Sequence, residues 1–130
     1  MFDVALPVRA VVLGVGLLAA ACASAQTATI ICGGNKSKKE FEGMYSDMKN
    51  HALTLLYISG NATYLSNVET RIEDASGQVV AQNPTCGPLG QVDVNAAGNY
   101  KITVRYNGKA QTREVALKPK GGERVMFTWE

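Results

Sequence analysis

The stretch YKITVRYNG (residues 100–108) decides the fold of this chain of 130 residues. Its apolar side chains at 100, 102 and 104 alternate with polar ones at 101, 103 and 105. This period is typical of a strand with one buried face and one face in water. The dipeptide Asn107-Gly108 that follows is the strongest short signal for a β-hairpin. A mainly β fold is therefore the first prediction.

Runs with the same period of two fill the chain from residue 51 to its end, and turn residues separate them. The predicted strands span residues 53–59, 67–73, 78–82, 91–94, 100–106, 110–118 and 124–129. Short strands at this spacing are typical of β-sandwiches. We expect a seven-stranded antiparallel Greek-key β-sandwich over residues 51–130.

The hairpin at residues 107–108 predicts a register as well. A two-residue loop places Lys101 opposite Glu114, which is a favourable cross-strand pair. The same register puts Arg113 on the core face. We expect a bulge near Thr112, or an open end of the sandwich there, in place of a buried arginine.

The N-terminal residues 1–25 have the features of a signal peptide. The uncharged run AVVLGVGLLAA (residues 10–20) follows Arg9 and is too short to span a membrane, and Ala23-Ser24-Ala25 matches the signal-peptidase pattern. We expect cleavage before Gln26 and a periplasmic or secreted protein. Two alternatives stay open for Cys22: AAAC (residues 19–22) resembles a lipobox, which would make an outer-membrane lipoprotein, or Cys22 leaves with the signal.

Export leaves Cys32 and Cys86 in an oxidising compartment, where an even number of cysteines indicates disulfides. We predict a Cys32–Cys86 bond. Its loop of roughly 55 residues would stabilise the fold by about 4 kcal/mol on the chain-entropy model. Two free thiols are the alternative.

A short helix is expected in the segment 26–50, ahead of the strands. Ser37-Lys38-Lys39-Glu40 has the spacing of a capping box, and the helix should run to about Asn50. Its apolar residues at 41, 44, 45 and 48 form one stripe. We expect this stripe to dock on the sandwich, with partner binding as the alternative.

Charge and residue types argue against catalysis and against nucleic acid as a partner. The 13 basic and 11 acidic residues leave a net charge of only +2, far from the positive field that binds a phosphate backbone. His51 is the only histidine, and a packing role suits it better than catalysis. The acidic residues Glu69, Glu73 and Asp74 fit a solvated strand face. We expect no enzyme, no metal and no cofactor.

The segment 83–90 (NPTCGPLG) is the most unusual stretch after the signal. Rigid loops often carry binding residues, so Asn83, Pro84, Thr85 and Pro88 are candidate binding residues. The alternative is that this loop merely fixes a crossover between two sheets.

Tyrosines provide a second candidate surface. Tyr57, Tyr64 and Tyr106 are expected to be exposed and could form a platform for a small molecule or a glycan. Tyr100 and Trp129 are expected to be structural, because they alternate with polar residues.

A family resemblance rests on LSNV (65–68), IEDASG (72–77), GNYKITV (98–104), YNGK (106–109) and VMFTW (125–129). Residues 50–130 thereby resemble the carboxypeptidase regulatory-like, or transthyretin-like, domains of bacterial exported proteins. The resemblance implies a prealbumin-like or immunoglobulin-like sandwich in which Tyr100 forms a tyrosine corner. It also implies a non-catalytic domain that assists folding, assembly or binding.

These observations predict a protein-interaction or structural module whose partner is another protein of the cell envelope. A small-molecule or glycan-binding module is the alternative. Contact with a membrane is expected only if Cys22 carries a lipid, and the sequence leaves the oligomeric state open.

Overall fold

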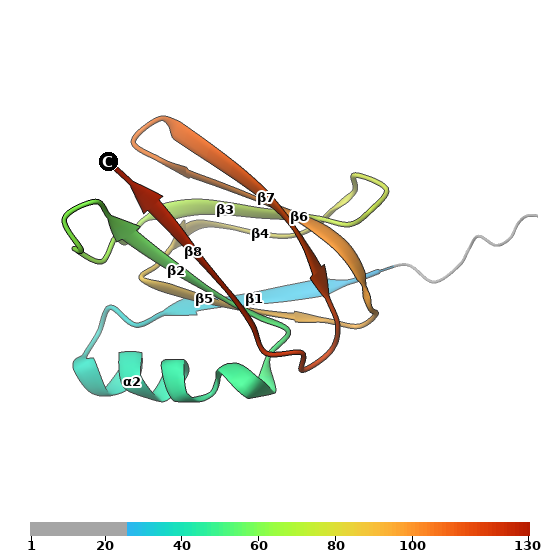
Figure 1. The fold of residues 1–130 in the computed structure, drawn as a ribbon, viewed down its shortest axis with the longest axis horizontal. Coiled ribbons are helices and arrows are strands. Elements are labelled where there is room, and N and C mark those ends of the chain that lie inside the picture. Colours follow the sequence, from blue (N-terminus) through green and yellow to red (C-terminus); the bar gives the residue numbers. More distant parts are fainter. Residues whose placement is uncertain (1–25) are drawn as a thin grey trace, which may run out of the picture.

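The computed structural model describes residues 26–130, which form two four-stranded β-sheets and one α-helix (Figure 1). Sheet I has the strand order β1-β5-β2-β8, and sheet II has the order β4-β3-β6-β7. The predicted signal peptide and Cys22 lie outside the described residues. The strands are β1 (Ala28–Gly33), β2 (Leu53–Ser59), β3 (Val68–Glu73), β4 (Val79–Cys86), β5 (Leu89–Val94), β6 (Gly98–Tyr106), β7 (Lys109–Leu117) and β8 (Glu123–Trp129).

The expected count of seven strands is wrong, because eight strands lie within residues 26–130. The additional strand is β1, which pairs antiparallel with β5 from Ala28 opposite Val94 to Gly33 opposite Leu89. This short run shows no sustained alternation, so it becomes a strand through a partner that is remote in sequence. The segment 26–50 therefore contributes to sheet I.

The expectation of purely antiparallel pairing is also wrong for β2 and β8. These strands run parallel, from Leu53 opposite Glu123 to Ser59 opposite Trp129. Parallel neighbours need a long connection, and here the chain passes through all of sheet II between them. The other strand boundaries agree with the predictions within two residues, except that β4 continues from residue 82 to Cys86.

The core lies between the sheets, where alternate residues of the strands point inward. On β3 and β6 the predicted apolar positions are buried and most of their neighbours are half-buried or exposed. Thus the alternation seen in YKITVRYNG does select the buried face. The largest fully buried side chains include Tyr57, Tyr100, Phe127, Leu53, Leu55, Ile72, Leu89 and Ile102.

The two sheets are joined along both open sides. On one side a disulfide connects Cys32 of β1 with Cys86 of β4, as predicted. On the other side the Gln111 side chain donates a hydrogen bond to the Thr128 carbonyl at 2.9 Å. Trp129 Nε1 also donates to the Lys109 carbonyl at 3.1 Å. These links partly cover sheet edges that would otherwise offer unpaired backbone groups.

The predicted hairpin register is confirmed, with Lys101 opposite Glu114 and Arg113 opposite Ile102. The pairing of β6 with β7 continues in register through Thr112, so the expected bulge there is wrong. Arg113 is exposed, and its guanidinium carbon lies 5.5 Å from the centroid of the Phe127 ring. The other alternative was an open end of the sandwich. Arg113 instead lies in the middle of the edge strand β7, where an open side of the sheet keeps its charge in water.

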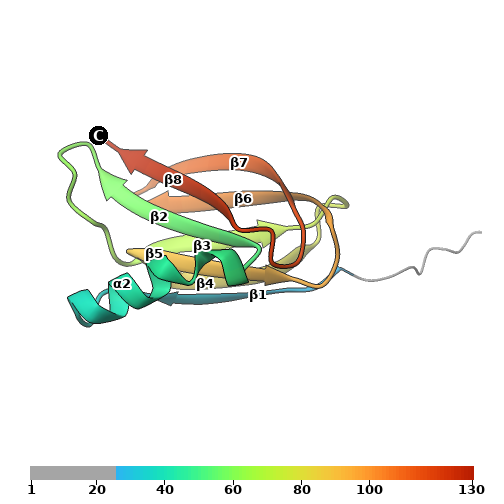
Figure 2. The same ribbon diagram turned by 60° about the horizontal axis from the view of Figure 1, so that its bottom comes forward.

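Helix α2 (Lys38–Ser46) and the 3₁₀ turn η2 (Met48–Asn50) lie against the outer face of sheet I (Figure 2). The capping interaction is present, because Ser37 Oγ accepts a hydrogen bond from the Glu40 N–H at 3.0 Å. The Gln91 side chain of β5 donates to the Met44 carbonyl at 2.7 Å. The helix therefore docks on the sheet, as its apolar stripe predicts.

Candidate binding groove

An open groove of about 570 Å³ lies where the first turns of α2 meet the β2–β3 loop (residues 60–67). Residues 34–38 form one part of its lining, and they comprise the connection from β1 and the first residue of α2. Phe41 and Glu42 come from the helix, and Tyr64 comes from the loop. Three segments that are separate in sequence thus meet at one end of the molecule.

Two aromatic rings form the apolar floor of the groove. The ring centroids of Phe41 and Tyr64 are 4.9 Å apart, with an angle of 42° between the planes. Tyr64 is 50% exposed, which is unusual for a large apolar side chain in this protein. Gly34 has a φ of +90°, and a Cβ there would lie 3.2 Å from the Phe41 ring. A side chain at residue 34 would crowd this floor.

The backbone holds Tyr64 in place before any ligand arrives. Tyr64 forms an antiparallel bridge with Ile58 at the end of β2. The flanking residues repeat this pattern, since the Leu65 N–H donates to the Tyr57 carbonyl at 3.0 Å and the Ser59 N–H donates to the Thr63 carbonyl at 2.8 Å. The loop is folded back on β2, so binding would cost little loop ordering.

Lysines line the groove beside the aromatic floor. Lys36 and Lys38 are both exposed. Lys38 Nζ lies 3.9 Å from Glu42 Oε2, but these side chains are 89% and 64% exposed, and such surface pairs contribute little. Among the described residues Lys36 takes part in no ion pair. The N-terminal end of α2 adds a partial positive charge to the same place.

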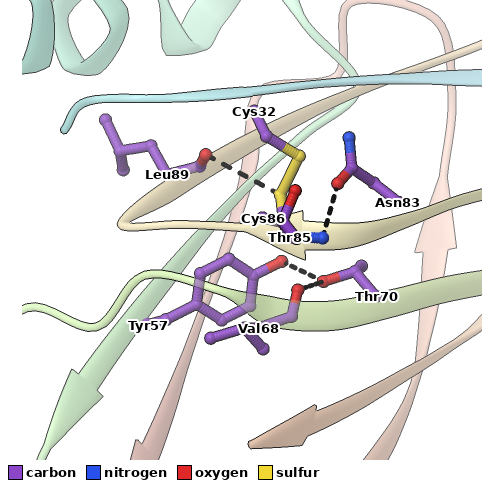
Figure 3. The surroundings of a disulfide bond; sticks show 8 residues. All are labelled: Cys32, Tyr57, Val68, Thr70, Asn83, Thr85, Cys86 and Leu89. Carbon is purple, nitrogen blue, oxygen red and sulfur yellow. Dashed lines mark hydrogen bonds between the residues drawn. A yellow bond between two sulfur atoms is a disulfide. The ribbon is translucent and has the colours of Figure 1, made fainter. Parts of the chain in front are cut away.

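The disulfide lies beside a buried polar contact between the sheets (Figure 3). Tyr57 of β2 is fully buried, and its hydroxyl lies 2.7 Å from Thr70 Oγ1 of β3. Thr70 Oγ1 in turn donates to the Val68 carbonyl at 3.3 Å. Because Thr70 gives its hydroxyl proton to the Val68 carbonyl, the Tyr57 hydroxyl is the donor to Thr70. Burial raises the pKa of the Tyr57 phenol.

Removal of the Tyr57 hydroxyl is expected to lower the free energy of unfolding by about 1 to 2 kcal/mol, because the Thr70 oxygen loses a buried partner. Urea unfolding of Tyr57→Phe measures this effect. Thr70→Val is the companion variant, and the double variant should lose less than the sum of the single losses. Wild-type stability in Tyr57→Phe would contradict the proposed contact.

The segment 83–90 is not one loop. Asn83, Pro84 and Thr85 belong to β4, an edge strand of sheet II. The register shifts between the pairs Val68–Cys86 and Thr70–Asn83, so β4 carries an irregularity where Pro84 stands.

Pro88 is buried between β4 and β5, and its carbonyl accepts a hydrogen bond from the Tyr57 N–H at 3.1 Å. Asn83 Oδ1 accepts from the Thr85 N–H at 2.8 Å. These positions favour a connecting role for the segment, and the binding role of Asn83, Pro84 and Thr85 stays a prediction.

The three tyrosines expected on the surface occupy different environments. The expectation for Tyr57 is wrong, because its side chain fills the core. Tyr106 is half-buried, with its ring centroid 5.8 Å from that of Trp129. Only Tyr64 combines large exposure with a groove, and it does so together with Phe41. Sequence analysis placed Phe41 in the helix stripe but did not connect it with Tyr64.

Tyr100 and Trp129 occupy structural positions. The Tyr100 hydroxyl donates to the Ala96 carbonyl at 2.8 Å and ties the start of β6 to the preceding turn. Burial, together with the charge of Asp74, raises the pKa of Tyr100. Trp129 is 5% exposed and donates to the Lys109 carbonyl.

His51 lies between two carboxylates. Its Nδ1 is 3.0 Å from Asp93 Oδ1 on β5, and its Nε2 is 3.2 Å from Asp47 Oδ2. The Asn50 amide, with a smaller contribution from His51, holds the pKa of Asp47 below its usual range. Both ring nitrogens are occupied, so the arrangement joins the end of the helical segment to sheet I.

Glu73 at the end of β3 and Asp74 just after it are less exposed than the expected solvated face, and both have structural partners. Glu73 lies 3.2 Å from Arg71 Nε and 3.5 Å from Lys101 Nζ. Asp74 Oδ1 accepts hydrogen bonds from the Ser76 hydroxyl and from the N–H of Gln78, and the bond from Ser76 in particular lowers the pKa of Asp74. Across residues 26–130 no three histidine, cysteine or acidic side chains come together as a metal site.

No family model matches the chain, and no curated protein matches it closely enough to indicate a relationship. Within the described part of the chain, no helix is long and apolar enough to cross a membrane.

Proposed function

We propose that this chain is a non-enzymatic, exported β-sandwich domain that acts as a protein-interaction module of the bacterial cell envelope. The observation that carries the proposal is the groove in which Phe41 and a half-exposed Tyr64 are held in position. Exposed aromatic side chains on a rigid frame are typical of surfaces that bind other molecules.

The connectivity of the strands supports a Greek-key arrangement of the prealbumin type. Strands β3 and β4 pair in sheet II, β5 crosses over to sheet I, and β6 returns to lie beside β3. This return of the fourth strand to the first is the feature that defines a Greek key. Strand β1 would then be an addition to that frame, at the edge of sheet I next to β4.

Two further observations are consistent with an exported, non-catalytic module. The Cys32–Cys86 disulfide suits an oxidising compartment. His51, the only histidine, has both ring nitrogens beside carboxylates, an arrangement that joins elements of the fold. The predicted cleavage before Gln26 would begin the mature chain shortly before β1.

Chemical cross-linking in intact cells, followed by purification and mass spectrometry, tests the interaction. We expect Tyr64→Ser to lose at least about nine-tenths of the cross-linked partner, since truncation of a central aromatic hot spot costs about 2 kcal/mol of binding or more, and about 1.4 kcal/mol is already tenfold. Ile31→Ser is the matched control, because Ile31 is 56% exposed but lies on β1, outside the groove.

Equal recovery of the partner by Tyr64→Ser and wild type would exclude the groove as the contact surface. Loss in both variants would instead indicate a general effect on the fold, which the unfolding curves of the two variants would reveal.

The aromatic floor also favours a second function, the binding of a small molecule or glycan, because a ring face can stack on a sugar. Titration of the mature protein with a panel of envelope glycans, followed by NMR, tests it. Saturable shifts confined to residues around Tyr64 would favour the glycan, and an unchanged spectrum would exclude it.

A further inference from the structure

We propose that the groove binds an extended acidic segment of a partner protein, with an apolar side chain of that segment on the rings of Phe41 and Tyr64. This inference rests on the proposed interaction function and names the chemistry of the partner. Other anionic ligands, such as acidic oligosaccharides, are outcomes of the test below.

The groove is large enough for a segment of extended chain. It is open to solvent and its volume is about 570 Å³, which exceeds the space that one side chain needs. The floor joins α2 to the β2–β3 loop, so a ligand that crosses the groove contacts both elements. An extended peptide can place one side chain on the floor while its neighbours point to either side.

The aromatic pair provides the apolar anchor point. Phe41 and Tyr64 are in contact, and Tyr45 continues the aromatic surface along α2, with a ring-centroid distance of 6.1 Å to Phe41. The Tyr45 hydroxyl accepts a hydrogen bond from Arg124 Nη1 at 2.6 Å, which ties it to β8. The floor is therefore held by β2, through the bridge to Tyr64, and by β8, through the Arg124–Tyr45 bond. It needs little rearrangement to receive a side chain.

The charges of the groove favour an acidic ligand. Lys36 and Lys38 supply two positive charges, while Glu42 is the only acidic residue among the described residues that line the groove. Glu40 of the same helix is not in the lining, but its carboxylate lies beside it, because its Oε1 accepts a hydrogen bond from the Lys36 N–H at 2.9 Å. That bond leaves the Lys36 ammonium group outside the interaction. Carboxylates of a ligand would complement the two lysines and the positive end of α2.

The test uses the mature chain from Gln26 and a labelled seven-residue peptide with a central phenylalanine between pairs of glutamates. Fluorescence polarisation measures affinity, and NMR shifts locate the site. We expect saturable binding with shifts around Lys36, Phe41 and Tyr64. Substitution of the peptide phenylalanine by alanine should weaken binding about tenfold, as should Tyr64→Ala in the protein.

Charge reversal provides the second part of the test. The double variant Lys36→Glu/Lys38→Glu should bind the peptide at least about tenfold more weakly. Lys118→Glu is the control, because Lys118 is exposed but lies after β7, outside the groove. High salt should weaken binding to wild type, since it screens exposed charges.

Several outcomes would overturn the inference. Equal binding of the phenylalanine and alanine peptides would indicate general charge attraction without an anchor. Equal effects of Lys118→Glu and the groove variants would exclude a local site. Shifts at Tyr64 with an acidic oligosaccharide, but none with the peptide, would assign the groove to glycans. If cross-linking depends on Tyr64 while the peptide does not bind, the interaction function stands and only the acidic partner is wrong.

Discussion

Cys32→Ser should lower the free energy of unfolding by about 4 kcal/mol, the largest loss that we expect from a single side chain. The bond joins residues separated by 54 positions, so it restricts a large part of the unfolded chain. It also holds the edge strands β1 and β4 together across the two sheets. Urea unfolding of the mature oxidised protein and of the variant measures the difference.

Cys86→Ser should give a similar loss, and the double variant should lose little more than either single variant, because one substitution already removes the bond. Reduction of the wild type should reproduce the effect, while the double variant should not respond to reductant. Wild-type stability in Cys32→Ser, or free thiols in the unfolded, unreduced protein, would contradict the role of the disulfide.

Gly87→Ala should lower the free energy of unfolding by about 3 kcal/mol or more, since both the backbone and the space around this residue disfavour a side chain. Gly87 has a φ of +115°, and a Cβ there would lie 2.4 Å from the carbonyl oxygen of Leu65 and 3.0 Å from the Tyr57 ring. The Leu65 carbonyl is backbone and cannot rotate away. Urea unfolding measures the loss.

Gly77→Ala separates the cost of the backbone conformation from the cost of crowding around the new side chain. Gly77 also has a positive φ, +89°, but nothing lies within 4 Å of a Cβ at this turn. Its loss should stay near 1 kcal/mol, the cost of the backbone conformation alone. Similar losses in Gly87→Ala and Gly77→Ala would show that the space around Gly87 plays no part in stability.

Local patterns in the sequence predicted much of the frame. The alternation in residues 100–106 and the Asn107-Gly108 turn predicted β6, β7 and their register, because side-chain period and turn geometry are local properties. Ser37 and Glu40 predicted the start of α2 for the same reason. The cysteine count predicted the disulfide once residues 1–25 were interpreted as a signal peptide.

Local patterns failed where a residue depends on distant partners. β1 has no clear alternation and becomes a strand by pairing with β5. Tyr57 was expected on the surface, yet the packing of sheet I on sheet II buries its side chain. Pro84 belongs to an edge strand and not to a loop. Because β4 pairs with β3 on one side only, a residue without a backbone N–H can stand in it.

The binding groove also depends partly on local sequence patterns and partly on tertiary contacts. By itself the sequence determined the mainly β frame, the capped helix with its aromatic stripe and the lysines near the helix start, since each depends on residues close together in the chain. Only the tertiary structure brought Tyr64 against Phe41, by folding the β2–β3 loop back on β2 and docking α2 on sheet I. That contact joins residues 23 positions apart, and no local period encodes it.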